Sequence, residues 1–246
     1  MILDEVYHDE LTDSTLQELK NIGRWFNTLY GNYPTIIGGW AVWLYNPLGY
    51  GSRDIDLLFP ERRTKERLAN QYLSANGYIL KKQSPFEEQF VKVVETSRGN
   101  EEIYLDACSV EDTNRVRGTS VEIPWALAIR NSELMDLKGL KFYVPRPEIL
   151  IMLKAKAALD REHDRKRAYD AYYLDSKIVK DYYDVVSLLK VCDFDSRLLN
   201  ESLESTDFKG MFLDVVERVV DKTDILSSHE LDKEEMRGRI GELELQ

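Results

Sequence analysis

Two aspartates spaced two residues apart offer the clearest chemistry in the sequence. Asp54 and Asp56 lie in an apolar run that ends at Phe59, downstream of the paired glycines Gly38 and Gly39. Alternate side chains of a strand share a face, so the two carboxylates would point the same way. Adjacent carboxylates repel each other unless a cation lies between them, and oxygen-only ligands suit Mg²⁺, which also binds phosphate oxygens. The glycines allow backbone N–H groups to approach an anion closely. These residues together indicate a site for a nucleoside triphosphate and metal ions.

Two strands and the helix between them must position this site. The apolar residues 34–37 predict a first strand, and residues 39–45 predict a helix that ends at Asn46-Pro47. Residues 54–59 predict a second strand, in which Ile55 and Leu57 would point away from the aspartates into a core.

A third aspartate, Asp106, lies on a strand later in the chain. Residues 90–94 and 103–107 flank a loop at 97–100, which predicts a hairpin with Asp106 on its second arm among apolar neighbours. Three carboxylates that face one way are hard to explain by packing, so we expect a metal site rather than a solvent-facing strand edge. The similar pair Asp193 and Asp195 has no glycines upstream, and we expect it to cap a helix.

The rest of the pattern predicts an α+β fold. A first helix should begin at a cap among residues 12–14 and end near Gly31, another should run from Pro60 to Asn76-Gly77, and residues 133–137 and 140–144 should form a hairpin. After Pro145-Arg146-Pro147 the pattern is helical throughout, with a charged tail from Ser227 that we expect to fray. We therefore predict a small mixed sheet flanked by helices in a core domain at residues 1–145. An all-helical domain should follow at residues 146–246.

Bulk composition excludes several classes of protein. The net charge of −11 argues against broad non-specific nucleic-acid binding, although a local basic groove stays open. No apolar run is long enough for a membrane span, and the acidic N-terminus does not resemble a secretory signal. Cys108 and Cys192 are far apart and are expected to be reduced thiols in a cytoplasmic protein. The sequence contains neither a P-loop motif nor a dinucleotide-binding glycine motif.

The motif around the two aspartates resembles the signature of the polymerase-β-type nucleotidyltransferase superfamily. The matching residues are Gly38-Gly39-x-Ala41 and Ser52-x-Asp54-Ile55-Asp56-Leu57. The resemblance implies a nucleotidyltransferase-type fold in which Asp54, Asp56 and Asp106 bind two Mg²⁺ ions. It also implies that Gly38, Gly39 and Ser52 contact the phosphates of a nucleoside triphosphate substrate.

The second half of the chain resembles the AbiEii-like branch of that superfamily, which includes toxins of abortive-infection and toxin–antitoxin systems. The matching residues are Pro147-Glu148-x-Leu150, a helical lysine at 154 or 156, and Lys180-Asp181-x-Tyr183-Asp184-Val185. The branch often has an arginine four residues before the first aspartate, where this chain has Tyr50. Arg53 is adjacent but would point to the opposite strand face.

The cationic side chain that contacts the phosphates is therefore expected to be Lys154 or Lys156. On a helix these two side chains point about 200° apart. We favour Lys156 slightly as the catalytic lysine and assign Lys154 to nucleotide binding; solvation of a helix face by both is the alternative. Asp181 and Asp184 share a helical face. They would orient the lysine or accept the proton of the incoming hydroxyl; the alternative is that they are solvent-exposed surface residues without a role in the site.

Basic and aromatic residues of the helical half are candidates for an RNA contact. The basic residues are Arg161, Arg165, Lys166 and Arg167, and the aromatic ones are Tyr169, Tyr172 and Tyr173. Pairing of the basic residues with neighbouring acids is an equal alternative, and a helical aromatic stripe is more often part of a core.

The sequence thus predicts an Mg²⁺-dependent nucleotidyltransferase that moves a nucleoside monophosphate onto an acceptor hydroxyl. The resemblance implies tRNA as a candidate acceptor and an antitoxin as a candidate partner. An adenylyltransferase that modifies antibiotic-like small molecules is the alternative enzyme, and a non-catalytic nucleotide-binding module is the alternative outside catalysis.

Overall fold

The computed structural model describes residues 2–84, 87–166 and 171–243. Its contacts divide the chain into two compact units. The first unit contains residues 3–112 and 128–145, and the second contains residues 113–127 and 146–246. The helix α5 (Trp125–Arg130) crosses the boundary between them. The predicted domains differ from these units in the segment 113–127, which belongs with the helical half.

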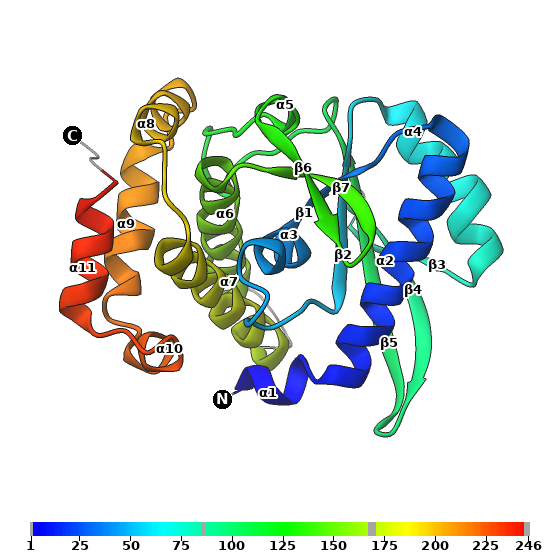
Figure 1. Cartoon of the computed structure of the whole chain (residues 1–246), viewed down its shortest axis with the longest axis horizontal. Helices are drawn as coiled ribbons and strands as arrows, with labels where there is room; N and C mark the ends of the chain where they lie inside the picture. The colour runs from blue at the N-terminus through cyan, green and yellow to red at the C-terminus, as the bar shows by residue number, and fades with distance from the viewer. Residues whose placement is uncertain (1, 85–86, 167–170, 244–246) are drawn as a thin grey trace. The chain divides into compact units, whose positions relative to one another are not determined.

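The strands of the first unit form a mixed sheet with the order β3-β4-β5-β2-β1-β7-β6 (Figure 1). Neighbouring strands are antiparallel, except that β1 pairs with β7 and β2 pairs with β5 in parallel. The predicted mixed sheet flanked by helices is confirmed, and the sheet of the described residues has seven strands. The strands are β1 (Thr35–Ile37), β2 (Asp54–Phe59), β3 (Ile79–Ser84), β4 (Glu87–Thr96), β5 (Gly99–Ser109), β6 (Ser132–Leu137) and β7 (Leu140–Pro145).

Strand β2 lies in the middle of the sheet because its side chains are apolar on both faces. Ile55, Leu57, Leu58 and Phe59 are fully buried, and Asp54 is also buried. A strand with covered faces on both sides reads as a nearly continuous apolar run, as this one does. Two aspartates in such a strand are costly to bury, so their position requires an explanation other than packing.

The helices of the first unit flank the sheet, and the longest of them begins earlier than predicted. They are α1 (Ile2–Val6), α2 (Asp9–Tyr30), α3 (Gly38–Tyr45) and α4 (Arg62–Arg67), the last continued by a π-helical turn (Leu68–Leu73) and a 3₁₀ turn (Ser74–Asn76). Helix α2 ends at the predicted Gly31, which adopts the left-handed conformation. It begins at Asp9 rather than at residues 12–14, and the hydroxyl of Thr12, one of the predicted caps, donates to the Asp9 carbonyl within the helix instead of capping its start.

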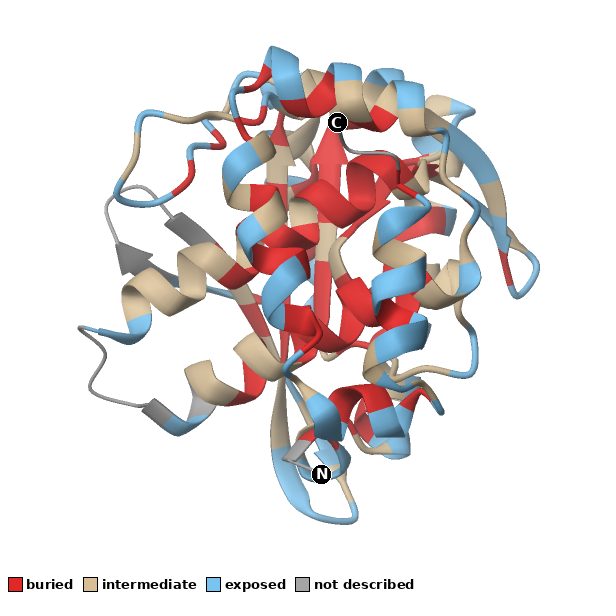
Figure 2. Cartoon of the chain, turned by 90° about the vertical axis from the view of Figure 1, so that its left-hand side faces the viewer, coloured by how far each residue is buried: buried red, intermediate tan, exposed pale blue. Residues whose placement is uncertain are grey.

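The second unit is built from helices packed around α6 and α7. These helices are α6 (Pro147–Arg165), α7 (Ala171–Val191), α8 (Ser196–Ser205), α9 (Lys209–Val219), α10 (Thr223–Ser228) and α11 (Lys233–Gly241). Pro147 occupies the first turn of α6, where a missing N–H costs nothing. Asp195 caps α8 by accepting from the Leu198 N–H, which confirms the expected capping role of the second Asp-x-Asp pair. Buried residues line the facing sides of these helices (Figure 2).

The expectation of a frayed tail from Ser227 is wrong for α10 and α11. Asp232 and Glu235 form a capping box at the start of α11, in which each side chain accepts from the other residue's backbone N–H. Met236 and Leu243 are buried and hold this segment onto the unit. The Asp-x-x-Glu spacing was visible in the sequence and is the signal that should have predicted the helix.

No helix within the described residues is both long enough and sufficiently apolar to cross a bilayer.

Candidate active site

Strand register brings the three predicted aspartates onto one face of the sheet. Asp56 is the direct partner of Asp106 where β2 and β5 run parallel, and Asp54 pairs with Tyr104 in the same register. Paired residues of neighbouring strands share a face, so all three carboxylates lie on the same side. Asp54 is buried, whereas Asp56 and Asp106 are half-buried.

The paired glycines form the start of helix α3 beside Asp56. Gly38 adopts φ +69°, and a Cβ placed there would lie 1.9 Å from Asp56 Oδ2. The preceding Ile37 makes no side-chain cap, and the first N–H groups of a helix have no partner within it. The glycine turn therefore brings backbone N–H groups next to the carboxylate face, which is the geometry that binds an anionic phosphate.

Ser52 has a structural contact in this arrangement. Its buried hydroxyl accepts from the Asp54 N–H at 3.2 Å, immediately before β2 begins. This bond fixes the turn that leads into the strand and thereby the position of Asp54. A hydroxyl can donate while it accepts, so the bond is compatible with the predicted phosphate contact.

Gln89 is a residue of the site that the sequence analysis missed. It lies on β4 directly opposite Asp106, and its Nε2 donates to both carboxylate oxygens at 3.2 and 3.0 Å. A polar residue before the apolar run 90–94 was visible in the sequence. The register of β4 against β5, which decides the contact, was not.

Arg53 lies on the aspartate face, so the predicted orientation toward the opposite face is wrong. Its guanidinium carbon lies 5.0 Å from the centroid of the Tyr104 ring, and Nη2 donates to the Glu102 carbonyl at 3.2 Å. Arg53 precedes β2 and is free of the strand's alternation, which explains the difference. Tyr50, at the position where the AbiEii-like branch often has arginine, donates from its hydroxyl to Asp4.

The carboxylates of this face affect the neighbouring thiol. Burial and, to a lesser extent, the charges of Asp106, Asp112 and Asp56 together raise the pKa of Cys108 to about 12, against the opposing charge of Lys65. The thiol therefore stays protonated at neutral pH.

In the second unit, Lys154 belongs to a buried network of charges between α6 and α7. Its Nζ lies 2.6 Å from Asp184 Oδ2 and 3.5 Å from Asp181 Oδ1. Arg161 also pairs with Asp181, and Lys180 also pairs with Asp184. Burial alone would raise the pKa of the Asp184 carboxyl, but Lys154 and Lys180 together lower it below its usual value.

Lys156 pairs with a different acidic residue. Its Nζ is 2.5 Å from Asp160 Oδ2, one helical turn along α6, and Asp160 also accepts from the Arg117 N–H at 2.8 Å. Among the described ion pairs of the second unit, Asp181 therefore contacts Lys154 and not Lys156. The predicted roles of Lys154, Lys156 and Asp181 beside the three aspartates stay predictions.

Two of the four residues in the predicted basic cluster have acidic partners. Arg161 pairs with Asp181, and Arg165 makes two hydrogen bonds to Asp175 at 2.6 and 3.2 Å. Lys166 is exposed, as is Tyr172. Arg167, Tyr169 and the side chain of Tyr173 lie outside the described residues.

The three carboxylates of the aspartate face are ligands of the type that suits a hard cation. Within residues 2–84, 87–166 and 171–243, no three histidine, cysteine or acidic side chains converge closely enough to hold a metal ion. The Mg²⁺ site therefore stays a prediction, which rests on ligand type and on the shared face.

Comparisons with known proteins give a fold similarity. No protein-family model matches the sequence, and neither does any curated protein. An antigenic nucleotidyltransferase-like protein from Paracoccidioides brasiliensis is similar in structure with a TM-score of 0.52 at 15% identity, over 88% of this chain and 91% of that one. A putative nucleotidyltransferase from H. pylori has a TM-score of 0.46 at 19% identity, over 96% of this chain and 93% of that one. The antibiotic-resistance factor ANT(2'')-Ia has a TM-score of 0.42 at 15% identity, over 89% of this chain and 98% of that one. The chain has a nucleotidyltransferase-like fold.

Proposed function

We propose that the chain is a divalent-metal-dependent nucleotidyltransferase that moves a nucleoside monophosphate from a triphosphate onto an acceptor hydroxyl. The observation that carries the proposal is the register of β2 and β5, which puts three carboxylates on one face beside the Gly38 turn. Packing does not account for acids in a strand that is otherwise apolar on both faces. The nucleotidyltransferase-like fold agrees with this site.

The chain's own residues have separate tasks in this proposal. The backbone at Gly38 and Gly39 binds the triphosphate, and Ser52 fixes Asp54 while its hydroxyl hydrogen is available to a phosphate. Asp54, Asp56 and Asp106 would hold Mg²⁺, for which carboxylate oxygens are suitable ligands. When bound, two such ions lower the pKa of the attacking hydroxyl and neutralise charge on the transferred phosphate.

The transfer itself forms one bond and breaks one. The acceptor oxygen bonds to the α-phosphorus, and the bond from that phosphorus to the β-phosphate oxygen breaks, which releases pyrophosphate. Asp106 is half-buried and is the proposed acceptor of the hydroxyl proton. Lys154 or Lys156 is the proposed cation on the phosphate side, and Asp181 is the proposed group that orients Lys154, with which it pairs.

The acceptor is the open part of the proposal. An RNA acceptor such as tRNA, with an antitoxin as regulatory partner, is the first candidate because of the resemblance to toxin-type proteins. The pairing of Arg161 and Arg165 with aspartates is an observation that favours the second candidate, a small cationic molecule of the antibiotic type. These acids reduce the positive charge available to an RNA backbone.

The deciding experiment incubates the full chain with Mg²⁺, each α-labelled nucleoside triphosphate, and either total RNA or a panel of aminoglycosides. We expect one labelled product class, no label in EDTA, and no label with Asp56→Asn. Asp193→Asn is the matched control, because it makes the same change in an Asp-x-Asp pair whose second member caps α8. Equal transfer by Asp56→Asn and wild type would rule out the assigned site, and metal-dependent triphosphate binding without any product would favour a binding module.

A further inference from the structure

Gln89 is held against Asp106 by the pairing of two antiparallel strands. The two residues are direct partners in the register of β4 and β5, so their side chains lie on the same face at the shortest cross-strand distance. Gln89 is only 8% exposed. A buried amide must satisfy its hydrogen bonds within the protein, and Gln89 does so on a carboxylate assigned above to the site.

The contact fixes the orientation of the Asp106 carboxylate. Nε2 of Gln89 lies 3.2 Å from Oδ1 and 3.0 Å from Oδ2, so both oxygens are held relative to one donor. A carboxylate accepts only, so the NH₂ end of the amide must face it. Two oxygens offer about four lone-pair positions, and the two hydrogens of an amide NH₂ use at most two of them.

The donor is neutral, and this matters for a metal ligand. Other carboxylates of the first unit accept from ammonium groups, as Glu18 does from Lys92 at 2.8 Å and Asp112 does from Lys65 at 3.0 Å. An ammonium group would offset the charge that attracts Mg²⁺, whereas an amide orients the carboxylate and leaves its charge unchanged. Hydrogen bonds of this kind to ligating carboxylates strengthen metal affinity.

We propose that Gln89 is a positioning residue that orients Asp106 as a metal ligand without neutralising it. The proposal rests on the proposed function, because it assigns Asp106 to a divalent-metal site. It adds a member to that site which no sequence motif contains.

The test measures binding of Mn²⁺ alone to the full chain, from the free-ion signal in electron paramagnetic resonance. Gln89→Met removes the donor at similar length, and we expect its Mn²⁺ dissociation constant to rise about 10–100-fold. Gln89→Asn keeps the amide group but shortens the side chain by one methylene, and we expect its Mn²⁺ dissociation constant to rise as well. Gln89→Lys keeps a hydrogen-bond donor but adds a positive charge that repels the metal ion. We expect this variant to lose the most Mn²⁺ affinity of the three.

Two further variants make the outcomes distinct. Gln17→Ala removes a glutamine that bonds to Asn21 on the exposed face of α2, and its affinity should equal that of wild type. Asp56→Asn should lose Mn²⁺ binding if the site is the one assigned. Failure of wild type to bind, or normal binding by Asp56→Asn, overturns the metal part of the proposed function together with this inference. If Asp56→Asn loses binding but folded Gln89→Met and Gln89→Asn bind Mn²⁺ as well as wild type, or more tightly, only the role of Gln89 is overturned.

Discussion

The Asp56 carboxylate occupies the space that a side chain on Gly38 would need. An ideal Cβ on Gly38 would lie 1.9 Å from Oδ2 and 2.6 Å from Cγ of Asp56, and the residue has φ +69°. The glycine is therefore required twice, once for its backbone conformation and once for the close approach of an acid from β2. One residue thus links the proposed phosphate turn to a proposed metal ligand.

Gly38→Ala should move the Asp56 side chain away from the turn that begins α3. The left-handed backbone alone costs an L-residue about 1–2 kcal/mol, and the methyl group must also displace the Asp56 side chain. We expect a lower free energy of unfolding in urea and a loss of both Mn²⁺ binding and nucleotidyl transfer.

Gly31→Ala is the matched control for the backbone term. Gly31 has a similar φ of +63°, and a Cβ there would meet nothing within 4 Å. Its variant should lose about 1–2 kcal/mol of unfolding free energy and keep its metal affinity. If Gly38→Ala behaves like Gly31→Ala in both measurements, the approach of Asp56 to the turn has no functional consequence.

Sequence patterns identified the parts of the site that depend on local spacing. The two aspartates of β2, the glycine turn before α3 and the strand around Asp106 all follow from side-chain period and backbone preference. The contact of Gln89 with Asp106 depends on the register of β4, which local spacing does not determine. Arg53 escaped prediction because it lies outside the strand whose alternation was applied to it.

The helical half shows the same limit. Helical geometry could separate Lys154 from Lys156 but could not say which of them meets α7. The structure pairs Lys154 with Asp181 and Asp184, and pairs Lys156 with Asp160 of its own helix. That distinction depends on how two helices pack, which involves residues far apart in the chain.

Removal of Asp184 should destabilise the second unit far more than removal of Lys154. The described contacts gather three cations, Lys154, Lys180 and Arg161, around Asp181 and Asp184. Lys154→Met leaves each carboxylate with one cation, so we expect a cost of about 1–2 kcal/mol, below the 3–5 kcal/mol range for breaking a buried pair. Asp184→Asn leaves three cations around one carboxylate, so we expect a cost of at least about 3–5 kcal/mol.

Urea unfolding at pH 7 gives the free energy of unfolding of both variants, and the prediction concerns which of the two loses more of it. A larger loss for Lys154→Met than for Asp184→Asn would contradict this charge count. Because Lys154→Met should stay folded, its transfer activity can be compared directly with that of Lys156→Met. The lysine whose loss abolishes transfer in a folded protein is the phosphate-side cation.

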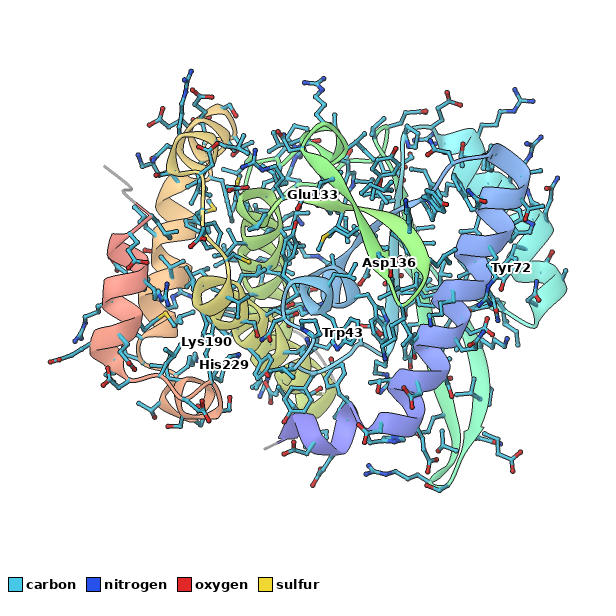
Figure 3. All side chains as sticks on the ribbon, viewed as in Figure 1. Trp43, Tyr72, Glu133, Asp136, Lys190 and His229 are labelled. Carbon is cyan, nitrogen blue, oxygen red and sulfur yellow. The ribbon has the colours of Figure 1, made fainter. Side chains whose placement is uncertain are left out.

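His229 should make the stability of the second unit depend on pH. The ring lies buried at the end of α10 beside Lys190 of α7 (Figure 3). Its Nδ1 lies 2.9 Å from the Ile225 carbonyl and therefore donates to it, while Nε2 accepts from the Ser187 hydroxyl at 2.8 Å. Burial lowers the pKa of His229, and the charges of Lys190 and Lys180 lower it further against the opposing Ile225 carbonyl and Asp184.

The sign of the effect follows from this lowered pKa. The unfolded chain binds a proton at His229 near pH 6.5, whereas the folded chain binds it only at lower pH. The contribution of neutral His229 is therefore complete above about pH 6.5 and is lost as the pH falls through the folded value. The loss can reach about 1.4 kcal/mol for each unit by which the pKa is lowered. We expect wild type to lose unfolding free energy between pH 7.5 and 5 by more than His229→Gln, which cannot titrate at this position. Measuring the difference between the two proteins removes the contribution of the other titrating groups, and equal losses would mean that His229 is not held neutral by its surroundings.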